Sequence, residues 1–438
     1  MGDIAVKKTI VLIIALCLCL SMCSCNSIDK IKKSLAGTSG SSSDASEAAS
    51  VNSKDYTADA YSFPNNPAEF TPVSEDDYFC YQYLNKKQKT AYKALVNAAQ
   101  HMNMMLFSVG KCTSNDVAVA VQAVMCDYPQ LFWLNQSYGT QIDDKDAKVT
   151  FNDPDGDYSY ICADETDRNY KMSQMYAKID DFIKAEINAS MSQYEIELKV
   201  HDWLCSITDY DNDAAGASAN RDSRGYEESW TAYGAIMNGK AVCAGYARAY
   251  QLVMNYLGIN CTCIMAQSND QIHMVNAVCI DNKWYYVDVT WDDDAIGDLD
   301  YIHDYFNLSY AEISGTHLVF ESFNTLDSSA DFSESKFNIA LPEAADTEKN
   351  YYSMKDLYIS SEGEFKQKIS SIFSNASANG KNTVEVRLGF CTPTADLMKK
   401  LIKDNDIMSV AKQYYGPVKN ISYGIMNNGA IYLRVNKR

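Results

Sequence analysis

The sequence predicts an α+β protein, in which a helical region precedes a helix packed on an antiparallel sheet and a smaller α/β unit follows. Apolar residues recur at helical spacing through much of residues 76–190. A helical pattern over residues 241–257 is followed by two strand-like runs, at 271–280 and 283–291. A strand, a helix and a hairpin then alternate within residues 350–438.

The N-terminus predicts an export signal. Two lysines precede an apolar run over residues 10–20, which is too short for a comfortable membrane-spanning helix. The sequence LSMCSC at residues 20–25 resembles a bacterial lipobox, in which a cysteine receives lipid and becomes the new N-terminus. We predict lipidation at Cys25, with Cys23 as the alternative, and an exported protein anchored by lipid to the cell membrane and facing outside. An ordinary secretory signal is the other interpretation.

Composition and the pattern of apolar residues divide the chain into five segments. Residues 1–25 form the lipoprotein signal peptide, and residues 26–75 form a flexible tether, because a Ser/Gly/Ala-rich stretch buries too little apolar surface to fold. Residues 76–190 form the mainly helical region and residues 191–345 the central core. Residues 350–438 form the C-terminal α/β unit.

The charge balance excludes some partners. The chain has 57 acidic and 38 basic residues and a net charge of −19, which argues against binding nucleic acid or anionic lipid through bulk charge. It contains no HExxH helix and no glycine-rich phosphate loop, so no metal and no organic cofactor are predicted.

Cysteines are frequent but do not form a compact disulfide framework. Four of the fourteen lie in the signal region, and the spacing of the other ten gives no recognisable pairing. We expect buried free thiols.

Helix starts are marked by capping residues. Asn85 followed by Gln88, and Ser192 followed by Glu195, fit the capping-box pattern. Ser114 is the expected cap of the helix that follows the one starting after Asn85.

We assign no catalytic or ligand-binding role to several other features. Residues 148–163 predict a hairpin whose acidic turn lacks the glycine and glutamate of an EF-hand loop. His201, beside Asp202 on a helix, is interpreted as half of a surface pair. In the C-terminal unit, residues 395–414 predict one helix, and Asn427-Asn428-Gly429 predicts a hairpin turn.

Cys243 is the first candidate for catalysis. The apolar stripe of the helix over 241–257 and the glycine after it place Cys243 in the first turn. A helix N-terminus carries partial positive charge, which favours the nucleophilic thiolate. A small buried cysteine is the alternative explanation.

His273 and Asp288 lie on the two strands that follow. A two-residue turn at Asp281-Asn282 places Ile280 opposite Lys283, so Asp288 faces the same side of the sheet as His273. Diagonal neighbours of this kind lie roughly 7–8 Å apart at the backbone, within reach of an imidazole and a carboxylate. A three-residue turn would put them on opposite faces.

The three residue types together predict a nucleophilic site. Cys243 is the nucleophile, His273 accepts its proton and returns it to the leaving amine, and Asp288 fixes the tautomer of the imidazole.

The same segment resembles the core of the transglutaminase-like superfamily, which has the papain-like cysteine-enzyme fold. The matching motifs are GKAVCAGYA around Cys243, HMVN from His273 and WYYVDVTW around Asp288. The resemblance covers about residues 195–317 and implies that these three residues occupy the triad positions. Bacterial lipoproteins with a helical region before this core are also similar.

Val275 departs from the family pattern, which usually has tryptophan there. Without the indole, we expect the His273–Asp288 pair to be exposed to water or the cleft to be wider. The oxyanion donor is open between the Cys243 backbone N–H and a side chain of Trp230 or Tyr233.

The leading function is acyl transfer through a Cys243 thioester, on a peptide or glutamine amide of a substrate at the cell surface. Water as acceptor would make the protein a peptidase or amidase, and a lysine amine would make it a cross-linker. One alternative is a non-catalytic cell-surface binding module with a vestigial cleft. The other is a disulfide-stabilised structural protein.

Overall fold

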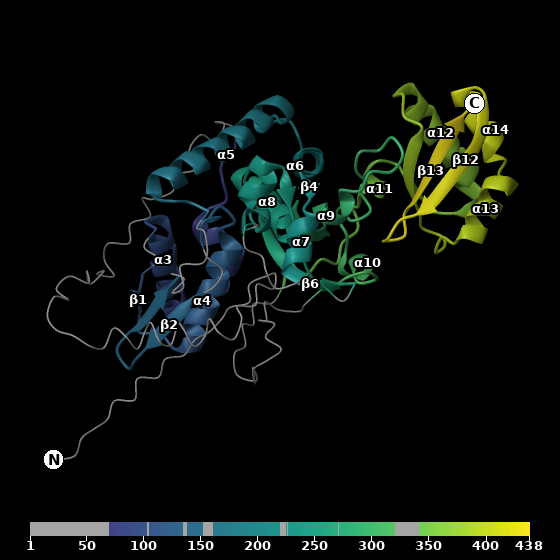
Figure 1. Ribbon diagram of the computed structural model, residues 1–438. Helices are drawn as coiled ribbons and strands as arrows, with labels where there is room; N and C mark the ends of the chain where they lie inside the picture. Colours follow the sequence, from purple (N-terminus) through teal and green to yellow (C-terminus); the bar gives the residue numbers. More distant parts are fainter. Residues whose placement is uncertain are drawn as a thin grey trace, which may run out of the picture.

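The computed structural model describes residues 70–102, 105–134, 138–151, 161–219, 225, 227–269, 271–319 and 341–438. The signal peptide, Cys23 and Cys25, nearly all of the tether and the acidic turn of the 148–163 hairpin lie outside these ranges, and they stay predictions. Figure 1 shows the N-terminal helices and the C-terminal unit on opposite sides of a central region. Among the described residues, no helix has both the length and the apolar character needed to cross a membrane.

The N-terminal region combines helices with a small sheet. Its strands β1, β2 and β3 are antiparallel in the order β1-β3-β2. The elements are η1 (Glu75–Asp77), α2 (Phe79–Tyr83), α3 (Lys86–Gln100), β1 (Phe107–Gly110), α4 (Ser114–Asp127), β2 (Gly139–Ile142), β3 (Ala147–Thr150) and α5 (Glu165–Glu186).

Two of the three predicted caps are confirmed. Asn85 and Gln88 form the capping box of α3, and Ser192 with Glu195 forms that of α6 (Gln193–Ile207). Ser114 was the wrong cap for α4. Thr113 has the extended backbone of a cap and closes a box with the residue three positions on, whereas Ser114 is already helical.

The central region places helix α8 against an antiparallel sheet, as predicted. The strands are in the order β8-β7-β6-β9, and α8 packs on β6 and β7. The elements are α6 (Gln193–Ile207), β4 (Asp209–Tyr210), α7 (Asn212–Ala219), η2 (Glu227–Trp230), η3 (Gly234–Asn238), β5 (Lys240–Ala241), α8 (Cys243–Tyr256), β6 (Cys261–Ser268), β7 (Gln271–Ile280), β8 (Lys283–Val287), α9 (Val289–Asp292), α10 (Tyr310–Ile313) and β9 (Leu318–Val319).

The C-terminal unit is a four-stranded sheet covered by helices. The strand order is β10-β11-β13-β12, with β10 and β11 parallel and the other pairs antiparallel. The elements are α11 (Tyr351–Met354), β10 (Tyr358–Ile359), η4 (Glu362–Glu364), α12 (Phe365–Ala378), β11 (Thr383–Leu388), α13 (Ala395–Asp404), α14 (Ile407–Tyr415), β12 (Val418–Ile425) and β13 (Ile431–Lys437).

One expectation for this unit was wrong. The single helix predicted over residues 395–414 is broken between α13 and α14, where Asp406 has a φ of 49°. A left-handed residue cannot continue a right-handed helix, so the chain changes direction there. The hairpin turn is confirmed, because β12 and β13 pair up to Ile425 and Ile431 on either side of it.

Two main apolar cores organise the described residues. One is continuous from the N-terminal helices through the central sheet, and α8 is buried along its whole length. The other lies inside the C-terminal unit, between its sheet and α12–α14. All ten cysteines in the described part of the chain are free thiols, and eight of them are buried.

Candidate active site

Cys243 is the first residue of α8, where the helical pattern predicts it. The residue before it, Val242, is extended and makes no side-chain cap, so the N-terminal N–H groups of the helix receive no cap from that side chain. The η2 turn packs against this helix end, because the Val242 N–H donates to the Ser229 carbonyl at 2.9 Å. The Cys243 side chain therefore sits at a positive helix end, and the residue is 5% exposed.

The hairpin between β7 and β8 has the predicted register. Asp281 and Asn282 have φ values of 51° and 63°, as a two-residue turn requires, and Ile280 pairs with Lys283. The second strand is shorter than predicted, since β8 ends at Val287.

Asp288 is the residue at which the strand becomes a helix. It caps α9, and its Oδ1 accepts a hydrogen bond from the Trp291 backbone N–H at 3.2 Å. The Asp288 N–H donates to the Tyr305 carbonyl at 3.1 Å. This short helix explains why the strand predicted over residues 283–291 stops early.

His273 lies between the carboxylate and the thiol. Its Nε2 is 2.7 Å from Oδ2 of Asp288, and its side chain also hydrogen-bonds to Cys243. Burial disfavours the charged imidazole, but the negative Asp288 and Cys243 outweigh burial and raise the pKa of His273 to about 10. Burial would likewise raise the pKa of Asp288, but the contacts with His273 and His317 hold it well below its ordinary value.

His317 is a member of the site that sequence reasoning missed. Its Nε2 lies 3.2 Å from Oδ2 of Asp288, and its Nδ1 lies 2.9 Å from the Thr316 hydroxyl. Its ring centroid is 5.3 Å from that of His273. No motif surrounds this histidine, and it comes from the loop before β9, so only the folded chain brings it to the carboxylate.

Of the two expectations tied to Val275, exposure of the His273–Asp288 pair is wrong, and a wider cleft stays a prediction. His273 is 8% exposed and Asp288 is 1% exposed, although Val275 stands where the family usually has tryptophan. Trp291 supplies an indole from another direction, with ring centroids 5.9 Å from His273 and 4.8 Å from His317. The pair is therefore shielded from water by other groups.

The two residues considered as oxyanion donors have other contacts, Trp230 through its backbone and Tyr233 through its ring. The Trp230 carbonyl accepts a hydrogen bond from Arg248 at 2.6 Å, and the Tyr233 ring stacks on Phe132 at 4.7 Å. Neither contact involves Cys243, so an oxyanion role for Trp230 or Tyr233 stays a prediction.

Comparison with known proteins identifies the central region. The family model described as "Transglutaminase-like superfamily" matches residues 181–289, about a quarter of the chain. Residues 181–289 belong to the transglutaminase-like superfamily. Members of this superfamily are usually cysteine peptidases or acyltransferases. The match confirms the predicted α+β fold with a transglutaminase-like, papain-like core.

Two solved structures resemble the chain weakly. One, titled "Crystal structure of a TGase", has 13% sequence identity and a TM-score of 0.28, and the match covers 37% of this chain and 46% of that one. The other is a putative cysteine protease from Cytophaga hutchinsonii, with 15% identity, a TM-score of 0.21 and coverage of 33% of this chain and 51% of that one. The chain thus spans about half the length of these structures. No curated protein matches the sequence.

Among the residues that the structure describes, two groups of side chains have the composition of a metal site. One is His273, Asp288 and His317, whose ligand-type atoms lie within 4.8 Å of one another. Because His273 there is also bonded to Cys243, this group is part of the nucleophilic site. The other group contains His201.

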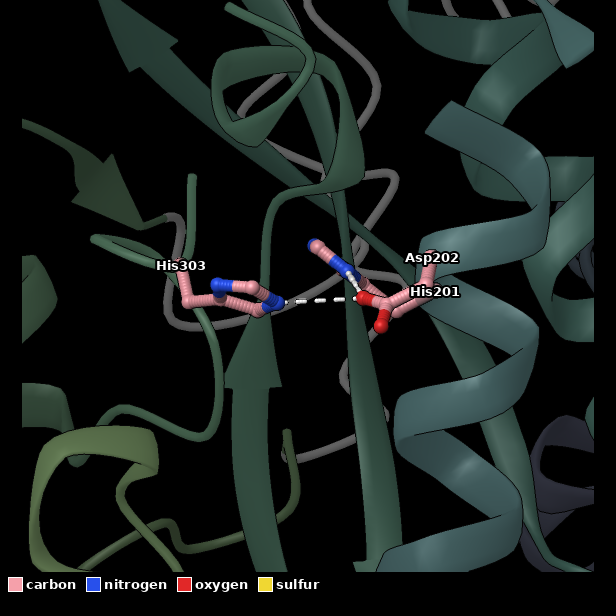
Figure 2. Close-up of side chains that lie close together, drawn as sticks. All are labelled: His201, Asp202 and His303. Atoms are coloured by element: carbon pink, nitrogen blue, oxygen red, sulfur yellow. Dashed lines mark hydrogen bonds and ion pairs between the residues drawn. The ribbon is translucent and has the colours of Figure 1, made fainter. Parts of the chain in front are cut away.

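His201 is not a surface residue, which corrects the sequence interpretation. It is 0% exposed, and its Nδ1 lies 3.0 Å from Oδ1 of Asp202. His303 Nε2 reaches the same Asp202 oxygen at 3.0 Å. Figure 2 shows His303, which follows α9, facing His201 and Asp202 of helix α6. Sequence reasoning missed His303, because it comes from a loop about a hundred residues further along the chain.

Proposed function

We propose that the protein is a cysteine acyl-transfer enzyme that cleaves peptide or glutamine amide bonds through a thioester. The observation that carries this proposal is the position of His273, which is bonded to Asp288 on one side and to Cys243 on the other. That arrangement supports an ion pair between a thiolate and an imidazolium, which is the reactive state of a catalytic cysteine.

The reaction has two steps. The Cys243 thiolate attacks the carbonyl carbon of the amide, and the tetrahedral intermediate collapses as the C–N bond breaks. His273 gives its proton to the departing amine, which leaves the acyl group on sulfur. Water or an amine then attacks the thioester, His273 accepts the proton of that nucleophile, and the C–S bond breaks.

Asp288 and the helix end support these steps. The carboxylate holds the imidazole by its Nε2, so that Nδ1 is the atom available to the sulfur. The backbone N–H of Cys243, at the start of α8, is the preferred donor to the developing oxyanion.

The group that accepts the acyl chain determines which reaction the enzyme catalyses. Transfer to water is hydrolysis, as in a peptidase or amidase, and transfer to a lysine amine is cross-linking. We propose substrates at the cell surface, since the sequence predicts an exported chain tethered by lipid at Cys25 or Cys23. Nucleic acid is not a proposed partner, given the net charge of −19.

One observation favours the second candidate, a non-catalytic binding module. Cys243 is only 5% exposed, which restricts the access of a substrate carbonyl to this residue. In that case the triad would be vestigial and the cleft would hold a peptide without cleaving it.

A thiol-directed probe distinguishes the two candidates. The full chain is treated with iodoacetamide, and labelling of each cysteine is followed by peptide mass spectrometry. The enzyme predicts fast labelling of Cys243 that slows at least tenfold in His273→Ala, while the other nine described cysteines label slowly in both proteins. Equally slow labelling at all ten sites would reject the enzyme and favour the binding module. A disulfide at Cys243 would support the structural protein.

A further inference from the structure

A second cluster of buried histidines and carboxylates lies where the central region meets the C-terminal unit. His201 and Asp202 come from α6, and His303 comes from the loop after α9. The other nitrogen of each ring, the outer one that does not contact Asp202, is also bonded to a carboxylate. His201 Nε2 lies 3.2 Å from Asp292, and His303 Nδ1 lies 2.7 Å from Glu385 of strand β11.

The outer carboxylates are fixed in place and buried. Asp292 accepts a hydrogen bond from the Tyr305 backbone N–H at 2.9 Å, and Glu385 accepts bonds from the His303 backbone N–H and the Tyr352 hydroxyl, both at 3.1 Å. Asp292 is 0% exposed and Glu385 is 6% exposed. Each imidazole is therefore oriented by a rigid acceptor behind it.

This arrangement leaves two nitrogen lone pairs converging on one oxygen. A neutral imidazole has a single N–H. If each ring donates that N–H to its outer carboxylate, His201 Nδ1 and His303 Nε2 both point lone pairs at Oδ1 of Asp202. Three electron-rich atoms then meet at one place, and the cluster needs two positive charges there. Two added protons or one divalent metal ion would supply them.

We propose that this cluster is a zinc site with ligands His201 Nδ1, Asp202 Oδ1 and His303 Nε2. Bond lengths of about 2.0–2.2 Å in a tetrahedral site place neighbouring ligand atoms roughly 3.3 Å apart. The two nitrogen–oxygen distances are close to this value, and all three ligand atoms lie within 4.8 Å of one another. Asp202 Oδ1 lies 3.0 Å from each nitrogen, so each of these two distances needs to lengthen by only about 0.3 Å. Figure 2 shows the three groups pointing toward one another.

The outer bonds are what distinguish this cluster from an ordinary buried salt bridge. Histidines that bind metal nearly always donate their second ring N–H to a carboxylate or carbonyl, which fixes the tautomer and raises the basicity of the ligand nitrogen. Here both histidines have such a partner, Asp292 and Glu385. The Asp202 side chain is 28% exposed, so water can reach this carboxylate, and a water molecule is the proposed fourth ligand.

The site would join parts that are distant in the sequence. Zinc would bind α6 to the loop that contains His303, and Glu385 would extend the connection into the C-terminal sheet. The ion would thus stabilise the packing of the C-terminal unit on the core, independently of any acyl transfer at Cys243.

Zinc binding to the full chain tests the proposal. The protein is stripped with a chelator and titrated with Zn²⁺ against a competing indicator at about pH 8, where ligand protonation competes less. We expect one zinc ion per chain, bound at least 100-fold more weakly by His303→Gln. Glu385→Gln, which changes the carboxylate behind His303 and leaves the three ligands in place, should weaken binding by roughly 10–100-fold. With Co²⁺, the visible spectrum should show a site without sulfur ligands.

His317→Gln is the matched control, because it removes a histidine from the other cluster. It should leave zinc affinity unchanged. If His303→Gln does not fold, as judged by circular dichroism, Asp202→Asn replaces it with the same expected loss. The proposal is overturned if the stripped wild type binds no stoichiometric zinc or binds it no better than His303→Gln. Loss of the site in His317→Gln alone, or a sulfur-to-cobalt charge-transfer band, would also overturn it.

Discussion

His317 Nε2 lies 3.2 Å from Oδ2 of Asp288, the carboxylate oxygen that His273 also contacts. One buried oxygen therefore receives two imidazoles, and both contacts help to hold the pKa of Asp288 well below its ordinary value. We infer that His317 is a positioning residue, which acts on His273 through the carboxylate that both share.

This role predicts different outcomes for two substitutions of His317. Glutamine retains an N–H donor and should keep the labelling rate of Cys243 within about threefold, whereas leucine removes the donor and should slow it by roughly tenfold, the effect of about 1.4 kcal/mol. The pH dependence of labelling should shift in His317→Leu and stay in place in His317→Gln. If both variants fold and show the wild-type pH profile, His317 has no positioning role.

The raised pKa of His273 predicts how its contribution to stability depends on pH. The folded value is about 10 and the reference value is 6.5, so the charged imidazole stabilises the fold fully below about pH 6.5 and loses that effect as the pH rises through 10. Removing one partner of a buried ion pair usually costs about 3–5 kcal/mol. His273→Ala should therefore lower the free energy of unfolding by an amount of this order at neutral pH, and by much less above pH 10.

Urea unfolding of wild type and His273→Ala across this pH range measures the difference directly. Subtracting the two curves cancels other titrating groups, including those around His303. A difference that does not change between pH 7 and pH 10.5 would mean that His273 is neutral in the folded protein.

Much of this site was predictable, because its geometry depends on local rules. The turn at Asp281-Asn282 sets the register of two adjacent strands, and this brings His273 and Asp288 together within a separation of 15 residues. Helical periodicity likewise places Cys243 at the N-terminus of α8. These relationships need only strand alternation and turn length.

The rest could not be predicted, because it depends on contacts between distant segments. His303 contacts Asp202, which lies 101 residues earlier in the chain. No sequence pattern around either residue indicates that the two are partners. The neighbouring pair His201-Asp202 suits an exposed helix face equally well, and it is packing against distant rings such as Phe306 and Tyr301 that buries His201. The early end of β8 was missed because the cap at Asp288 competes with a strand pattern that continues past it.

Gly245 allows the η2 turn to approach the N-terminus of α8. A Cβ at this position would lie 2.6 Å from the Ser229 carbonyl and 2.7 Å from Ala241 Cβ, both closer than ordinary contacts. Gly245→Ala should destabilise the protein by about 1–3 kcal/mol, as overpacking usually does, and should displace Cys243. Slower labelling of Cys243 and a lower urea midpoint are the expected results.

Gly216→Ala is the matched control, because it lies in helix α7 and no atom lies within 4 Å of the added Cβ. That substitution should be neutral or stabilise by up to about 1 kcal/mol, from helix propensity. Equal urea midpoints for the two variants would show that the close contact at Gly245 is not important.

Asp304 connects the central region to the hairpin of the C-terminal unit. Its carboxylate accepts hydrogen bonds from Arg387 at 2.8 Å and from the Asn428 and Ala430 backbone N–H groups at 2.6 and 3.1 Å. The residue is 0% exposed, so Asp304→Ala leaves buried donors without an acceptor and should cost about 3–5 kcal/mol. Asp304→Asn should cost less.

Limited proteolysis and urea unfolding test this connection. The expected result for Asp304→Ala is earlier cleavage between the central region and residues 350–438, with a lower unfolding midpoint. Lys399→Ala is a control, since Lys399 forms an exposed ion pair with Asp396 and its loss should change stability by less than about 0.5 kcal/mol. If Asp304→Ala is no more sensitive to protease than this control, the connection does not depend on the carboxylate.

The central claim is that Cys243, His273 and Asp288 act as one nucleophilic site, and trapping the acyl-enzyme tests it most directly. The full chain is mixed with an activated acyl ester, quenched in acid within seconds, and examined by peptide mass spectrometry. We expect one acyl group, attached to Cys243, that forms at least tenfold more slowly in His273→Ala and in Asp288→Ala. Acylation spread over several cysteines, or equal rates in wild type and both variants, would contradict it.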